Sequence, residues 1–382
     1  MPEAYIIDAV RTPVGRRGGS LSGIHPADLA AAVLVELIDR TGIPPEAVDD
    51  VIMGCVGQIG SQALNIGRIA WLSAGLPEGV PATTLDRQCG SSQQAAHFAA
   101  QGVMAGVYDL VVAGGIEVMS TVPILSNVTI GADAGLGHPH ESAGWRKRYG
   151  DQEINQFRGA ELIAEQWGFS REELERFALQ SHQRAVRARD NGYFEREVVV
   201  VAGLDHDECM RPDTSLEKMA QLVPLPGHNL LTAAVCSQIS DGSAAMLIAS
   251  EAAVTRYGLT PRARFHAFSV VGSDPVLMLT GPIPATKTVL ARADMSIEDI
   301  DLFEVNEAFA PVVLAWAADT GASLEKTNVN GGAIALGHPL GATGMRLMTS
   351  MLHELERTGG RYGLQTMCEG DGMANATIIE AV

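Results

Sequence analysis

The sequence is poor in positive charge. Its 27 Lys and Arg residues are outnumbered by 45 Asp and Glu residues, so the formal net charge is −18 at pH 7. Such a balance opposes broad electrostatic binding to nucleic acid or to an anionic membrane. We therefore expect neither as a partner, and a polyanionic ligand would need a local basic pocket.

Paired cysteines and long hydrophobic runs are also missing. The five cysteines are widely separated and form no CxxC pair, a distribution typical of a reducing compartment: Cys55, Cys89, Cys209, Cys236 and Cys368. No window of about 18 uncharged apolar residues occurs. The N-terminus has no basic segment followed by a long apolar one. These features predict a complete cytoplasmic protein without a disulfide scaffold.

Apolar residues and glycine are abundant. Of 382 residues, 46% are hydrophobic and 41 are glycine, which excludes a disordered chain. The opening AYIIDAV has the pattern of a β-strand, and HPADLAAAVLVELIDRTG has apolar residues at helical spacing. A second strand and a second helix follow. This alternation predicts an α/β fold with a buried sheet.

The chain also contains an internal repeat. Segment 47–56 resembles 298–308, and 108–119 resembles 362–373, with similar spacing in both halves. The stretch between the halves is polar and rich in histidine, and it includes a helix for which Ser170 and Glu173 have capping-box spacing. We predict a duplicated core with an inserted loop domain that supplies a substrate-binding wall. The predicted boundaries are 1–118 plus about 239–260, 119–238 for the insertion, and 261–382.

Three residues of the two predicted halves are candidates for catalysis. Cys89 is predicted to lie at a helix N-terminus, where the helix dipole favours a thiolate, although an inert buried cysteine fits the same context. His338 lies in a glycine-rich loop, which presents a side chain rather than packing it. Cys368 ends a strand before Gly370, a pattern that combines an acid/base group with an oxyanion donor.

Together these motifs resemble the thiolase family. The resemblance rests on RQCGSSQQAA around Cys89, EVNEAFA at 304–310, NGGAIALGHPLGATG around His338 and the CxGxG pattern at Cys368. It spans essentially the whole chain. It implies a duplicated, layered αβαβα core with an inserted loop domain that binds coenzyme A (CoA). The implied activity is that of an acyl-CoA:CoA acyltransferase.

The resemblance also implies a division of labour. Cys89 attacks the 3-keto carbon, and His338 takes its proton. Cys368 protonates the departing acetyl-CoA enolate, or removes that proton in the synthetic direction. A water held by Asn306 joins His338 in one oxyanion hole, and the backbone N–H groups of Cys89 and Gly370 form the other.

No resident metal or organic cofactor is expected, because the thioester itself stabilises the carbanion. CoA is the expected cosubstrate. By resemblance, Arg211 lies near its nucleotide phosphates and Ser237 binds its pantetheine arm. The resemblance also implies a homodimer or a homotetramer.

The sequence departs from the family pattern in two places. Asn155 and Gln156 occupy the positions of a His-Met pair beside the acyl group in acetoacetyl-CoA thiolases, which predicts longer, bulkier or ring-bearing acyl groups. Glu369 and Asp371 flank Gly370, where apolar residues or glycine are more usual, and acidic neighbours raise the pKa of a thiol such as Cys368.

Several functions remain open at this point. The leading prediction is degradative cleavage of a 3-oxoacyl-CoA, and the close alternative is biosynthetic condensation to acetoacetyl-CoA by the same residues. A decarboxylating ketoacyl synthase would carry a second histidine in place of Cys368. A non-catalytic acyl-CoA or lipid carrier would not require Cys89, Asn306, His338 and Cys368 together.

Overall fold

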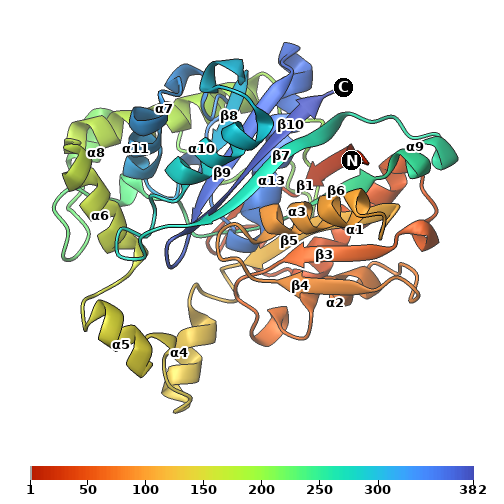
Figure 1. The fold of residues 1–382 in the computed structure, drawn as a ribbon. Coiled ribbons are helices and arrows are strands. Elements are labelled where there is room, and N and C mark those ends of the chain that lie inside the picture. Colours follow the sequence, from red (N-terminus) through yellow and green to blue (C-terminus); the bar gives the residue numbers. More distant parts are fainter. Residues whose placement is uncertain (1) are drawn as a thin grey trace.

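The computed structural model describes residues 2–382 and contains one mixed β-sheet with helices on its faces (Figure 1). The strands are β1 (Tyr5–Arg11), β2 (Gly15–Arg16), β3 (Asp50–Gly54), β4 (Ala82–Leu85), β5 (Leu110–Val118), β6 (Ser240–Ala249), β7 (Ala263–Gly272), β8 (Leu302–Val305), β9 (Tyr362–Glu369) and β10 (Met373–Ala381). Along the sheet they run β4-β3-β5-β6-β1-β7-β10-β9-β8, and β2 pairs with β6.

Helices connect and cover these strands. They are α1 (Pro26–Thr41), α2 (Ile66–Ser73), α3 (Ser91–Met104), α4 (Ser126–Asp133), α5 (Ala143–Tyr149), α6 (Gln156–Trp167), α7 (Arg171–Asp190), α8 (Leu216–Ala220), α9 (Glu251–Tyr257), α10 (Pro282–Ala293), α11 (Ala310–Thr320), α12 (Ala333–Leu336) and α13 (Leu340–Thr358). Within residues 2–382, no helix is long and apolar enough to cross a membrane.

The sheet repeats one pattern in mirrored order. β3 pairs with β5 in parallel and β5 with β6 antiparallel; likewise β8 pairs with β9 in parallel and β9 with β10 antiparallel. The antiparallel pair of β1 and β7 joins the two halves at the centre. The predicted duplication of an α/β core is therefore confirmed.

Three apolar clusters divide the molecule into layers. One packs α1 and α2 on the N-terminal half-sheet, and another packs α10 and α11 on the C-terminal half-sheet. The third contains residues of both half-sheets together with α3 and α13, which lie between them. The order of layers is helix, sheet, helix, sheet, helix, in agreement with the predicted αβαβα arrangement.

Equivalent aspartates mark the repeat. Asp49 Oδ2 accepts hydrogen bonds from the backbone N–H groups of Asp109 and Leu110, and Asp301 Oδ2 accepts them from Arg361 and Tyr362. The equivalent of Asp301 is thus Asp49. Sequence similarity alone does not distinguish Asp49 from the neighbouring Asp50, because it does not show which carboxylate binds the next strand.

Local signals account for individual helices. α1 begins with Pro26 and ends before Gly42, which adopts a left-handed φ of 64°. The capping box predicted from Ser170 and Glu173 is present at the start of α7. The chain between β5 and β6, residues 119–239, holds α4 to α8 and adds no strand to the sheet.

Candidate active site

Cys89 lies in the tight turn between β4 and α3, two residues before α3 begins. Gln88 adopts a left-handed φ of 48°, and Ser91 Oγ accepts a hydrogen bond from Arg87 N and donates one to Gln88 O. Gly90 is needed because a Cβ there would lie 2.0 Å from Glu369 Oε1. The turn therefore presents Cys89 at the start of a central helix, as the sequence predicts.

The expected thiolate at Cys89 does not follow from this position. Burial, followed by the charge of Glu369, raises the pKa of the Cys89 thiol to about 12. The prediction that the helix end favours the ionised form is wrong for the resting site, because desolvation outweighs the helix. A base must remove the proton as the reaction begins.

His338 has the geometry of such a base. Its Nδ1 lies 2.7 Å from Thr343 Oγ1, and that hydroxyl donates its only proton to Pro339 O. Thr343 must therefore accept from Nδ1–H, which leaves the lone pair on Nε2. Asn306 Nδ2 donates to this atom at 3.3 Å. Burial lowers the pKa of His338 to about 3, so the imidazole is neutral.

The loop that follows β8 brings Asn306 to His338. Asn306 Oδ1 is buried without a hydrogen-bond partner among residues 2–382, so it is free to accept from a water or a ligand. The adjacent Glu307 accepts from Ser181 Oγ, Asn328 Nδ2 and Ile334 N. Glu307 thereby ties the insertion and the glycine-rich loop to the end of β8.

Cys368 is fully buried near the end of β9. Burial, the nearby Cys89 and Glu369 raise its pKa well above the ordinary value, so it holds its proton. The following turn lies against Gln88, since a Cβ on Gly370 would meet the Gln88 side chain at 3.2 Å. Both cysteines and the Gly370 turn are thus neighbours, although Cys89 and Cys368 are far apart in sequence.

Two carboxylates occupy corresponding places near the ends of β5 and β9. Glu117 accepts from Val56 N, Gly57 N, Gln62 Nε2 and Gly341 N. Glu369 lies against Gly90 at the start of the other central helix, yet neither of its oxygens has a hydrogen-bond partner among the described residues. Its burial raises its pKa to about 8, so it is neutral at pH 7.

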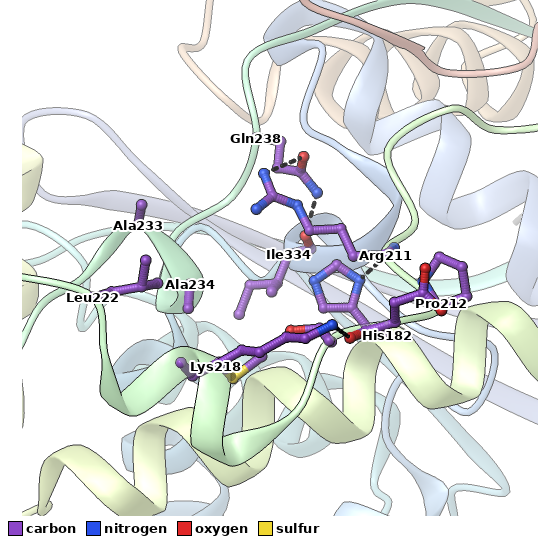
Figure 2. A pocket seen from close by; sticks show the side chains of 12 residues that line it. His182, Arg211, Pro212, Lys218, Leu222, Ala233, Ala234, Gln238 and Ile334 are labelled. Carbon is purple, nitrogen blue, oxygen red and sulfur yellow. Dashed lines mark hydrogen bonds between the residues drawn. The ribbon is translucent and has the colours of Figure 1, made fainter.

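A cavity of about 410 Å³ lies beside the insertion, lined by Arg211, Lys218 and His182 among others. Figure 2 shows the Arg211 guanidinium reaching the Gln238 side chain, where Nη2 donates to Oε1 at 3.3 Å. Gln238 also links this pocket to the base, because its carbonyl accepts from His338 N at 3.1 Å. Ser237 is not among the lining residues, and its N–H donates to Ala308 O.

Sequence reasoning did not single out Thr343, Gln238 or His182. Thr343 lies within the glycine-rich motif around His338, so a search for an acceptor near Nδ1 would have found it. His182 accepts a hydrogen bond from Arg211 N, and burial lowers its pKa to about 4. Nothing in the sequence around Gln238 or His182 distinguishes them from other polar residues.

The side-chain amide of Asn155 is hydrogen-bonded within the protein. Asn155 caps α6, since its Oδ1 accepts from Arg158 N at 2.9 Å and its Nδ2 donates to Glu153 Oε1 at 2.6 Å. Gln156 begins the same helix. Both polar atoms of the Asn155 side chain are therefore already engaged within the protein, Oδ1 as the cap of α6 and Nδ2 as a donor to Glu153.

Comparisons with known proteins agree with this arrangement. The model of the thiolase N-terminal domain matches residues 4–252, and that of the thiolase C-terminal domain matches residues 259–381. The chain is 60% identical to the steroid 3-ketoacyl-CoA thiolase FadA6 of Mycobacterium tuberculosis, over 100% of this chain and 94% of that protein. It is 43% identical to a beta-ketoadipyl-CoA thiolase of Escherichia coli, with both chains fully covered.

Solved structures show the same likeness. The crystal structure of human mitochondrial 3-ketoacyl-CoA thiolase superposes with a TM-score of 0.89 at 38% identity, and that of the Bacillus anthracis acetyl-CoA acetyltransferase with 0.91 at 37%. Each comparison covers 100% of this chain and 99% of the other. With both domain models matched and relatives aligned along the entire chain, this protein belongs to the thiolase family.

Proposed function

We propose that this acyltransferase cleaves a 3-oxoacyl-CoA with CoA, releasing acetyl-CoA and a shortened acyl-CoA. The observation that carries the proposal is the pairing of a neutral His338 with Asn306, together with two protonated thiols that are neighbours, Cys89 before α3 and Cys368 near the end of β9. The 60% identity to a steroid 3-ketoacyl-CoA thiolase supports an acyl group that is bulky or ring-bearing.

In the proposed first half-reaction, His338 Nε2 accepts the proton of the Cys89 thiol as the sulfur attacks C3. The C2–C3 bond breaks, and the electron pair remains on the acetyl-CoA enolate. Cys368 donates its proton to C2 and becomes a thiolate, while the acyl group stays on Cys89. Stabilising the developing oxyanions contributes about 3–4 kcal/mol per donor.

The second half-reaction reverses these proton transfers. The Cys368 thiolate takes the proton of the CoA thiol, and the CoA sulfur attacks the acyl group. Cys89 leaves as a thiolate and regains its proton from His338. Every proton is returned, so the cycle needs no exchange with solvent. The same residues also support condensation, and metabolite concentrations then set the direction.

We further propose CoA as the ligand of the pocket lined by Arg211. Arg211 and Lys218 supply positive charge to the polyanionic nucleotide end, which offsets the negative charge of the whole chain. Gln238 lines this pocket and accepts a hydrogen bond from His338 N through its carbonyl. Substituting Arg211→Gln is expected to raise the KM for CoA about tenfold with a smaller change in kcat.

A thiolysis assay tests the main proposal. Loss of the enolate absorbance after CoA addition is expected with acetoacetyl-CoA and with a ring-bearing 3-oxoacyl-CoA.

A second experiment tests the roles of the two cysteines. Incubation with a simple acyl-CoA should leave an acyl adduct on the peptide that contains Cys89, detected by mass spectrometry. In Cys368→Ala the adduct should persist while turnover falls by several orders of magnitude. An adduct on Cys368 instead would refute the assigned roles.

The five cysteines are all free, which supports a reducing compartment, and we propose the cytoplasm.

We also propose that the chain forms a homodimer through the open edge of β4. In Figure 1 this strand lies at the margin of the sheet, and the adjacent Leu64 is 87% exposed. Unpaired strand edges and exposed apolar side chains favour pairing with another chain.

A further inference from the structure

An arm of the insertion, residues 123–153, contacts the turn that carries Gly370. The arm contains α4 and α5 and extends away from the sheet and its layers (Figure 1). Between these two helices, His140 Nε2 lies 3.3 Å from Asp371 Oδ1. Asp371 directly follows Gly370 and adopts a left-handed φ of 59°, a conformation that favours glycine. Asp371 thus stands at a backbone position where glycine would be less strained.

The arm holds His140 in a fixed orientation. The His140 ring stacks on Trp145 with a centroid separation of 4.0 Å and an interplanar angle of 3°. The backbone N–H of His140 donates to His138 Nδ1, and Glu141 completes a capping box around the same turn. Because the imidazole is already ordered by these contacts, pairing with Asp371 costs little further side-chain entropy.

The root of the arm lies beside the nucleophile. Ile124 and Cys89 both pack against one small apolar cluster of Val56, Met119 and Leu340. Asn127 Nδ2 also donates to Val56 O at 3.4 Å. The arm thus leaves the body beside Cys89 and touches it again where His140 meets the Gly370 turn, so both of its contacts lie near the reacting residues.

We propose that the arm forms a wall of the acyl-group site and that His140 and Asp371 are specificity-determining residues that hold this wall in place. The inference rests on the proposed thiolase function and deepens it. A short acyl group on Cys89 occupies only the surroundings of the thiol, whereas a long or ring-bearing group extends to the arm. Fastening the arm therefore matters most for bulky substrates.

The test compares His140→Ala, Asp371→Asn and the double variant. Asn tolerates the left-handed φ and keeps the side-chain shape, so Asp371→Asn removes the charge without disturbing the turn. For each protein, kcat and KM are measured with acetoacetyl-CoA and with a ring-bearing 3-oxoacyl-CoA. The quantity compared is kcat/KM for the ring-bearing substrate divided by kcat/KM for acetoacetyl-CoA. We expect this ratio to fall about tenfold in each single variant, because the KM for the ring-bearing substrate rises. The double variant should show the same fall as the single variants, because both substitutions remove the same contact.

His206→Ala is the matched control, since His206 Nδ1 forms a 2.7 Å pair with Asp205 elsewhere on the insertion. It should leave the substrate ratio unchanged. Hydrogen exchange supplies a second readout, and residues 123–153 should exchange faster in His140→Ala and Asp371→Asn than in the parent. Equal losses on both substrates, or an unchanged ratio with unchanged exchange, would overturn the proposal. A parent enzyme inactive on every 3-oxoacyl-CoA would refute the proposed function instead, while the exchange comparison still decides whether the pair fastens the arm.

Discussion

Cys89, Cys368, His338 and Glu369 are neutral at rest, and burial is the main cause. Desolvation lowers the pKa of His338 to about 3, whereas it raises those of Cys89 to about 12 and Glu369 to about 8. Cys368 is shifted in the same direction as Cys89. A base and an acid are therefore both present in their uncharged forms. Charge develops only when a substrate occupies the site.

Thr343 is expected to control which nitrogen of His338 is the base. In Thr343→Val, Nδ1–H loses its acceptor and the proton can move to Nε2, which then cannot accept from Cys89. We predict a loss of about 10–100-fold in kcat and in the rate of Cys89 acylation, with little change in the KM for CoA. Thr343→Ser keeps the hydroxyl and should restore most of the rate. A serine variant as impaired as the valine variant would contradict this role.

Glu369 is expected to make stability depend on pH. Its pKa in the folded protein is about 8 against an ordinary value of 4.5, so the folded state binds the proton more tightly. The stabilising contribution is complete below about pH 4.5 and is lost as the pH rises through 8. As the pH rises from 5 to 8, the free energy of unfolding of Glu369→Gln should therefore increase relative to that of the parent. Urea denaturation measures this difference. A difference that does not vary with pH would refute the prediction, and the exposed Glu298→Gln is the control.

At the scale of elements, the two central helices begin where glycine permits close contact. A Cβ on Gly341 would lie 2.7 Å from both Cys55 Cα and Ile116 O, and 2.8 Å from Glu117 Oε2. Gly90 stands in the corresponding relation to Glu369 at the start of α3. The two helices α3 and α13, which begin two residues after Cys89 and His338, are therefore held against the ends of opposite half-sheets.

The variant Gly341→Ala tests whether this close contact, rather than the low helix propensity of glycine, determines stability at the start of α13. Backbone atoms surround the new methyl group, so the start of α13 must shift, and we predict a loss of about 1–3 kcal/mol in stability. Activity should fall as well, because His338 lies two residues before this helix begins. Gly131→Ala in α4 is the control, since nothing lies within 4 Å of its Cβ position. Denaturant unfolding of both variants checks the prediction, and equal effects would count against it.

At the scale of the whole molecule, the open edge of β4 decides the expected assembly. The parent should scatter light as a species of about twice the 40.3 kDa chain mass, or a multiple of that dimer. Leu64→Asp should shift it toward 40.3 kDa. Asp suits the left-handed φ of 56° at this position and adds a charge beside β4. Val200→Asp introduces the same charge on the insertion and should leave the mass unchanged. A monomeric parent would refute the dimer.

Much of the fold was predictable because its signals are local. Ser170 and Glu173 are close in sequence, so their capping box needs only the helix they begin. The position of Cys89 between a strand and a helix also follows from neighbouring residues. The equivalence of Asp49 and Asp301 was not predictable at residue precision, because it depends on hydrogen bonds to the next strand.

The sequence by itself determined the order of strands and helices, the duplication and the residue types available for acyl transfer. Only the tertiary structure decided their chemical state. Cys89 has a raised rather than a lowered pKa because distant segments bury it beside Glu369. Asn155 caps a helix, while Asp371 meets His140 from the arm. Periodicity and caps depend on short-range geometry, whereas desolvation and charge pairing depend on which remote segments come together.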